Sequence, residues 1–280
     1  MKTWFKFLGI ITIAVVIGFS VVSCSSSGSG STSPTSTPLP PVTGGTAADR
    51  SPSTAVATTP AQIPDFEGKE AMSNAEFADF KASLSEEFEG LGNDLLGGGF
   101  LNVQLSNLAS SYSRKLVTES DIIYLSELFD MMDDEEKAGI RTMNGYLRYA
   151  ASYNDGDDPF PLTANGDAKF FIETSETGIS DSDFGKVIGS IAGNGSVSNV
   201  RIVDENNISG TINFAVNYAA NLLTEEDKWV KVIGDIKANS NLSTGSMSAT
   251  ATMKAYGDAE LGNIKVTINI TPENVSVIVE

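Results

Sequence analysis

The last eighty or so residues of the chain alternate between apolar and polar side chains. Ile212, Phe214, Val216 and Tyr218 occupy every second position, and polar residues such as Asn213 lie between them. A period of two places successive side chains on opposite faces of a β-strand, and short turns between such segments join neighbouring strands. We therefore expect an antiparallel β-meander with one apolar face and one solvated face.

The same pattern predicts the strands around this segment. Strands are expected at Ala168–Thr174, Val197–Asp204 and Ile208–Ala219, with a helix at Ser180–Ala192. The later strands carry these apolar positions: Val230, Val232, Ile236 and Ala238; Met247, Ala249, Ala251, Met253 and Ala255; Ile264, Val266, Ile268 and Ile270; Val275, Val277 and Val279. Turns are expected at Asp204–Asn207 and Thr271–Asn274, because Asn, Asp and Pro favour turn conformations.

The stretch before residue 154 instead shows apolar residues spaced by three and four, which predicts four helices. The first begins with a capping box, in which Ser73 and Glu76 satisfy backbone N–H groups. The four apolar stripes are Phe77, Phe80, Leu84, Phe88 and Leu91; Leu101, Leu105, Leu108, Tyr112 and Leu116; Ile122, Leu125, Phe129 and Met132; Ile140, Met143, Leu147 and Ala150. Thr118 with Asp121 and Asp133 with Glu136 are the expected caps of the third and fourth helices.

Helices with an apolar stripe and a sheet with one apolar face can cover each other. We therefore expect an α+β fold, with N-terminal helices packed on one face of a C-terminal antiparallel β-meander. The expected division is a helical part at 65–153 and a mainly β part at 154–280, which together form one domain.

Residues 25–64 consist of Ser, Thr, Pro, Gly and small apolar residues, with Asp49 and Arg50 as the only charges. This composition buries too little apolar area to offset the entropy of ordering the chain. The sequence therefore predicts a disordered tether over residues 24–64.

The first 23 residues combine Lys2 and Lys6 with an apolar run of secretory-signal length. The run ends in Val21-Val22-Ser23-Cys24, which resembles the lipobox of bacterial lipoproteins. The resemblance implies cleavage after Ser23 and lipidation of Cys24, including an acyl chain such as palmitate, which would hold the protein to a membrane. Ser25 follows Cys24 where Asp would suggest retention at an inner membrane, so the resemblance favours the outer membrane or cell surface. Cys24 is the only cysteine, and no intramolecular disulfide can form.

The chain carries 36 acidic and 18 basic residues, a formal charge of −18, and it has no histidine. A strong negative field repels nucleic acid, which we do not expect as a partner. Without histidine the commonest general base and zinc ligand are missing, and no cofactor is expected. The leading interpretation is a non-enzymatic binding or interaction domain for an unknown protein or small-molecule ligand. A carrier or sensor of an apolar small molecule and a carboxylate-dependent hydrolase of wall or glycan are the alternatives.

The sequence suggests two further sites. Asp155, Asp157 and Asp158 form an oxygen-rich loop that could bind calcium, although Asn, Asp, Gly and Pro also serve there as turn residues. Tyr146, Tyr149 and Tyr153 would share one side of the fourth predicted helix. They could stack against a ligand or pack in the core.

Overall fold

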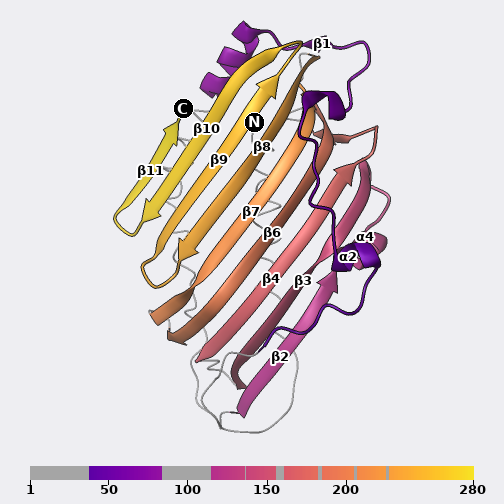
Figure 1. Cartoon of the computed structure of the whole chain (residues 1–280). Helices are drawn as coiled ribbons and strands as arrows, with labels where there is room; N and C mark the ends of the chain where they lie inside the picture. The colour runs from indigo at the N-terminus through magenta and orange to yellow at the C-terminus, as the bar shows by residue number, and fades with distance from the viewer. Residues whose placement is uncertain are drawn as a thin grey trace.

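The structure, a computed structural model, describes residues 38–83, 115–135, 137–155, 161–181, 185–204, 207–224 and 227–280. The described chain is mainly β (Figure 1): an eleven-stranded sheet is accompanied by short helices. The strands are β1 (Glu70–Ala71), β2 (Lys115–Tyr124), β3 (Ile140–Asp155), β4 (Leu162–Thr174), β5 (Ile179–Asp181), β6 (Gly185–Asp204), β7 (Asn207–Leu223), β8 (Lys228–Asn241), β9 (Ser246–Tyr256), β10 (Glu260–Thr271) and β11 (Asn274–Val279). The helices are α2 (Ala47–Arg50), the 3₁₀ turn η1 (Pro60–Gln62), a helix over 74–83, and α4 (Leu125–Met131).

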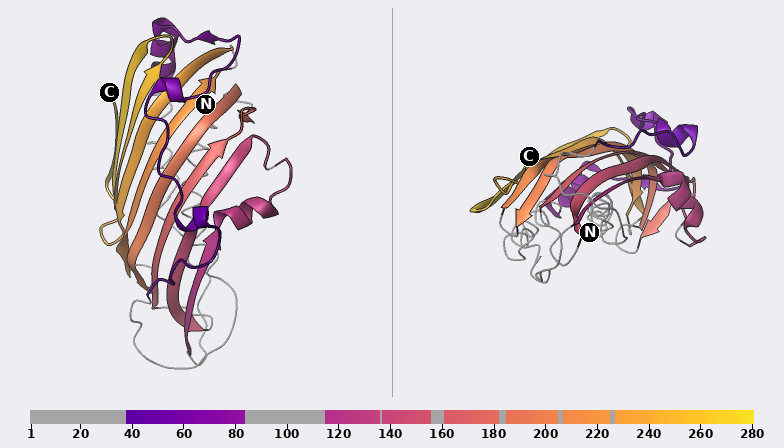
Figure 2. Two further views of the ribbon diagram at one scale, coloured as in Figure 1. Left: turned by 45° about the vertical axis from the view of Figure 1, so that its right-hand side comes forward. Right: turned by 90° about the horizontal axis from the view of Figure 1, so that it is seen from below.

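The sheet follows the order β11-β10-β9-β8-β7-β6-β4-β3-β2, and all of these neighbours are antiparallel. β5 pairs with β6, and the short β1 lies parallel to β8. Figure 2 shows that the sheet is curved. Among the strands that the structure describes, β11 and β2 are therefore the two outer ones of a long, curved sheet.

Alternation along the strands gives this sheet two chemically different faces. The apolar face carries the main core cluster, in which Val216, Val230, Val232 and Ala255 are almost completely buried. The opposite, polar face carries a row of aligned side chains that crosses six strands: Ser196, Asn213, Asn239, Ser248, Asn269 and Ser276. The expected meander with one apolar and one polar face is confirmed.

The capping box at the first predicted helix is also confirmed. The Ser73 N–H donates to Glu76 Oε2 at 2.7 Å, and the Glu76 N–H donates to Ser73 Oγ at 3.3 Å. Phe77 joins the core cluster with Met253 and Ile264, so the helix over 74–83 packs on the apolar face. Leu84, Phe88 and Leu91 lie outside the described residues, as does the second predicted stripe from Leu101 to Tyr112.

The third predicted helix is confirmed only in part, and the fourth predicted helix and the helix at Ser180–Ala192 are wrong. Of the third stripe, Ile122 lies in strand β2, whereas Leu125 and Phe129 lie in the short helix α4. The fourth predicted helix is strand β3. Residues 180 and 181 belong to β5 and residues 185–192 to β6, and residues 182–184 lie outside the described residues. In each case spacings of three and four are mixed with β-branched, aromatic and glycine residues, which favour strands or disfavour helices, and pairing with neighbouring strands decides the outcome.

The strands predicted from residue 168 onward are confirmed within β4, β6, β7, β8, β9, β10 and β11. Asp204 pairs with Asn207 and Thr271 with Asn274, as expected for the two turns. Because β2 and β3 belong to the same sheet, the division into a helical part at 65–153 and a β part at 154–280 is not observed. In the part of the chain that the structure describes, no helix is both long enough and apolar enough to cross a membrane.

Candidate functional site: a strap-covered cavity on the polar face

Residues 38–71, which we call the strap, run over the sheet from β3 to β8 (Figure 1). Figure 2 shows this segment on the outer, convex side of the sheet. The prediction of a disordered tether is therefore wrong for residues 38–64, and residues 24–37 lie outside the described residues. The strap has few large apolar side chains, so polar contacts with the sheet must hold much of it in place.

Asp49 fixes the first half of the strap. It follows Thr46, the N-cap of α2, and its carboxylate accepts hydrogen bonds from the Thr46 N–H and hydroxyl at 3.0 and 2.7 Å. The same carboxylate accepts from the Gly145 N–H on β3 at 3.0 Å, and from the N–H and hydroxyl of Ser126 in α4. Asp49 is completely buried. One side chain therefore joins the strap to two other elements.

Hydrogen bonding keeps the Asp49 carboxylate charged. Burial on its own would raise the pKa of this group, but the hydrogen bonds from Ser126, Thr46 and Gly145 together outweigh burial and lower the pKa from 3.8 to about 2. At neutral pH Asp49 is therefore an anion that accepts several hydrogen bonds, which are stronger than bonds between neutral groups.

Two further contacts hold the start of the strap. Arg148 on β3 binds both carboxylate oxygens of Asp167 on β4 at 2.8 Å, and its remaining N–H group donates to the Pro40 carbonyl at 2.8 Å. The Gly44 N–H donates to the Tyr124 hydroxyl at 2.8 Å. Gly45 has a φ of +64°, and a Cβ there would lie 2.4 Å from the Tyr124 ring. Glycine is required at this close approach.

Polar side chains from β7 and β8 hold the second half of the strap. Lys231 is buried; its ammonium group donates to the Pro60 carbonyl at 3.0 Å and pairs with Asp65 at 2.6 Å. Asn221, also buried, donates to the Pro64 carbonyl at 2.9 Å. A lysine and an asparagine inside the structure thus satisfy carbonyl groups of a segment that has few partners of its own.

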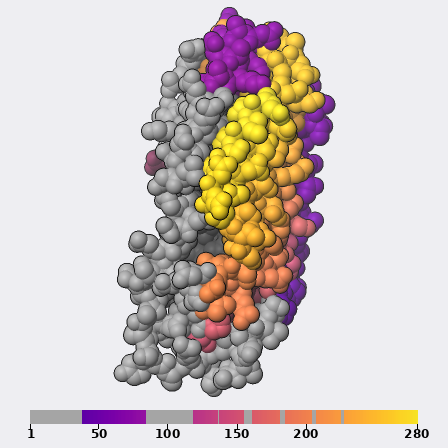
Figure 3. Space-filling model, turned by 90° about the vertical axis from the view of Figure 1, so that its left-hand side faces the viewer, coloured from indigo at the N-terminus to yellow at the C-terminus, as the bar shows by residue number. Residues whose placement is uncertain are grey.

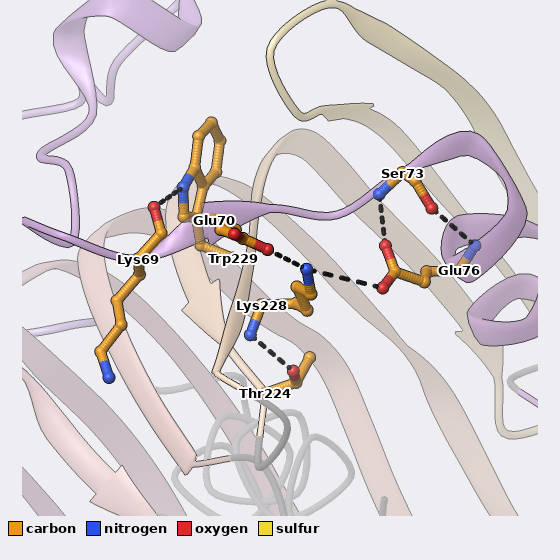
Figure 4. A network of polar contacts seen from close by, with 7 residues as sticks. All are labelled: Lys69, Glu70, Ser73, Glu76, Thr224, Lys228 and Trp229. Atoms are coloured by element: carbon orange, nitrogen blue, oxygen red, sulfur yellow. Dashed lines mark hydrogen bonds and ion pairs between the residues drawn. The ribbon is translucent and has the colours of Figure 1, made fainter.

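Figure 4 shows the junction where the strap ends with β1 and the chain continues into the helix over 74–83. The Trp229 indole N–H donates to the Lys69 carbonyl at 3.2 Å, beside the parallel pairing of β1 with β8. Lys228 forms ion pairs with Glu70 and, at 3.9 Å, with Glu76 of the capping box. The junction therefore ties the strap and the helix to the same strand, β8.

Between the strap and the sheet lies a cavity of about 440 Å³ that is partly open to solvent. Strap residues 55–57 and 62–64 form one side, and β3, β4, β6, β7 and the turn after β4 form the other. Its apolar lining includes Val56, Ile63, Phe171 and Ile188. This volume is within the range of small-molecule sites, which are concave, largely apolar and supplied with a few polar groups.

The cavity also has three charged side chains: Arg141, Glu173 and Glu176. Arg141 binds Glu173 through two nitrogen atoms, with 3.2 Å between Nε and Oε2. Hydrogen bonding to Glu173 raises the pKa of Arg141, so the guanidinium stays charged. One cation and two carboxylates leave the lining with a formal charge of −1. Such a lining favours a neutral or cationic ligand over an anionic one.

The three predicted tyrosines do not form one surface. On strand β3, Tyr149 and Tyr153 follow Tyr146 at an odd offset in position, so Tyr146 lies on the opposite face. Tyr146 is buried, beside Arg148, and burial raises its pKa. The Tyr153 hydroxyl donates to Glu119 at 2.8 Å. The three tyrosines would share one side only in a helix, and residues 140–155 form strand β3 instead.

The predicted calcium loop and the predicted lipidation site lie mostly or wholly outside the described residues. Asp155 is the last residue of β3, and Asp157 and Asp158 lie outside the described residues. Among the residues that are described, no group of three or more acidic, cysteine or histidine side chains could hold a metal ion. Cys24 and Ser23 also lie outside the described residues, so lipidation and calcium binding stay predictions.

The polar side chains that hold the strap or line the cavity were not expected from the sequence: Asp49, Arg141, Arg148, Asn221 and Lys231. One local signal was present: Thr46 and Asp49 form a capping box in a segment with almost no other charge. For the other four no local pattern exists, because their partners are distant in the chain. Comparison with protein-family models, curated proteins and solved structures found no match to this chain.

Proposed function

We propose that the chain is a lipid-anchored cell-envelope protein whose folded part is a non-enzymatic binding domain, and that the cavity beneath the strap is its ligand site. The observation that carries this proposal is the cavity itself, of about 440 Å³ and formed jointly by the strap and the sheet. Burial of most of a small ligand's surface in such a concave site is the main source of its affinity.

The lining defines the ligand class. Val56, Ile63, Phe171 and Ile188 favour an apolar body, and the formal charge of −1 favours a neutral or cationic group at one end. Glu173 is held in place by its ion pair with Arg141. Binding therefore accounts for this arrangement without any reaction step.

A carrier or sensor of an apolar small molecule is the form of binding that the lining favours most. A carrier would retain such a molecule during purification, which native mass spectrometry of the lipid-free chain from Ser25 onward would detect. This chain keeps the whole strap. A fragment that starts at Asp65 would remove one wall of the cavity.

Filling the cavity tests the site. Ser190 on β6 lines the cavity, whereas Ser196 lies on the same strand and face, is equally half-buried, and is outside the lining. With the neutral dye N-phenyl-1-naphthylamine as the probe, Ser190→Phe should lower the affinity at least about ten-fold, because the ring occupies ligand space. Ser196→Phe should bind the dye as the unsubstituted chain does.

Fluorescence titration of the three proteins measures these affinities, and thermal melting verifies that each is folded. Equal affinity for the dye in both variants would remove the cavity as the ligand site. The absence of saturable binding in the unsubstituted chain would count against binding of apolar molecules altogether.

The anchor has a separate test. Cells that express the full chain should incorporate labelled palmitate into it, and Cys24→Ser should abolish the label completely because the acceptor sulfur is lost. Fractionation of the envelope membranes would then place the labelled protein, for which we propose the outer membrane or cell surface. Equal labelling of both chains would show that Cys24 is not the attachment site.

A further inference from the structure

The strand at one edge of the sheet lacks the features that usually prevent edge pairing. β11 (Asn274–Val279) contains no charged residue and no proline, and it pairs with β10 without a register shift. The outer strand β2 at the other edge contains the charged residues Glu119 and Asp121. Natural sheets protect their edges with charges, prolines or bulges, and an edge without them is a template for another strand.

Hydrogen bonding shows which backbone groups of β11 are available. Lys265 and Glu280 exchange both of their backbone hydrogen bonds, at 3.0 and 2.8 Å. In an antiparallel pair such residues alternate with residues that point their N–H and C=O groups away. The register therefore directs these groups of Val275, Val277 and Val279 away from β10. Figure 3 looks toward this edge and shows β11 at the molecular surface.

We propose that β11 pairs with β11 of a second copy of this chain, antiparallel and with Val277 opposite its own counterpart. This register forms hydrogen-bonded pairs at Val277 with Val277 and twice at Val275 with Val279, which makes six backbone hydrogen bonds across a twofold axis. The axis is perpendicular to the sheet, so the two apolar faces lie on the same side and the sheet continues from one copy into the other.

Charge and side-chain matching favour a second copy as the occupant. The three outward pairs are all Val with Val, and β-branched pairs of this kind stabilise neighbouring strands. Glu280, which already pairs with Lys265 at 2.6 Å, comes opposite Asn274 of the other copy, so no like charges meet. For a chain with a formal charge of −18, an uncharged edge is where two copies can approach with least repulsion. This proposal is independent of the cavity.

The test uses the full chain in detergent of matched density, measured by sedimentation equilibrium. We expect a mass twice that of the monomer at micromolar concentration, and a monomer for Val277→Pro. Proline at residue 277 removes an outward N–H and leaves the hydrogen bonds to β10 intact, and edge strands tolerate such a proline. A dimer that persists in a folded Val277→Pro variant would overturn the proposal. A monomeric unsubstituted chain would also overturn it, even if that chain binds foreign peptides at the β11 edge.

Cysteine cross-linking decides the matter if the proline variant fails to fold. Val277→Cys should form a disulfide-linked dimer on mild oxidation, because twofold-related Cα atoms in a hydrogen-bonded pair are about 5.5 Å apart. Lys254→Cys is the control: Lys254 is an exposed residue of β9, away from the edge, and this variant should stay monomeric. Equal cross-linking of both variants, or none at residue 277, would contradict edge pairing.

Discussion

The C-terminal meander forms part of the sheet and the strap lies over that sheet, and the two are held in place in different ways. In the meander, β7 to β11 form long antiparallel ladders, and their apolar side chains share one core cluster. The strap has only the two residues of β1 in a ladder and depends on single polar side chains such as Asp49 and Lys231. Stability is therefore distributed in the meander and concentrated in the strap.

The largest expected effect comes from the meander core. Ile236→Ala removes a side chain that is 7% exposed and should cost about 2–5 kcal/mol of global stability, because the lost transfer energy adds to the cost of a cavity. Ile278→Ala, at a position that is 50% exposed, should cost less than about 1 kcal/mol. Urea unfolding of the chain from Ser25 onward measures both. Similar costs at the two positions would show that the apolar face does not dominate stability.

Acid should release the strap before the meander. The pKa of Asp49 is about 2 in the folded chain and 3.8 in its ordinary range. The folded value is the lower one, so the stabilisation is complete above pH 3.8 and is lost as the pH falls toward 2. It amounts to about 2 kcal/mol.

Hydrogen exchange at the Gly145 amide, which donates to Asp49, should report this release. Between pH 4 and pH 2 the protection of this amide should fall, after correction for intrinsic rates, while amides of Val232 and Met253 stay protected. Asp49→Asn should already be less protected at neutral pH and should lose the pH dependence. Simultaneous loss of protection in the strap and the meander would show one cooperative unit.

The smallest expected effect is at the second half of the strap. Lys231→Met keeps the apolar stem and removes the contacts with Pro60 and Asp65. Because Asp65 is 75% exposed, the ion pair is largely screened by water, and we expect a loss below about 1 kcal/mol. Limited proteolysis within residues 55–64 measures the local opening. A global loss of several kcal/mol would make the strap an integral part of the core.

Near residues 207–279, local pattern was sufficient for prediction. Strict alternation specifies the strand and also which face each side chain takes, because a shift of one residue would exchange the two faces. Over residues 140–150 the local pattern does not distinguish a helix from a strand, because a helical stripe also fits the apolar residues Ile140, Met143, Leu147 and Ala150. Only pairing with β2 and β4 selects the strand. Local spacing cannot represent the hydrogen bonds that a neighbouring strand supplies.

By itself, the sequence determined the antiparallel meander, its apolar and polar faces, and the capped helix over 74–83, because each depends on residues close together in the chain. Only the tertiary structure decided the path of the strap and the existence of the cavity. Asp49 meets Gly145 across 96 residues, and Lys231 meets Pro60 across 171. A polar segment without a core of its own becomes ordered when distant buried groups satisfy its backbone, and those partners exist only after the sheet has formed.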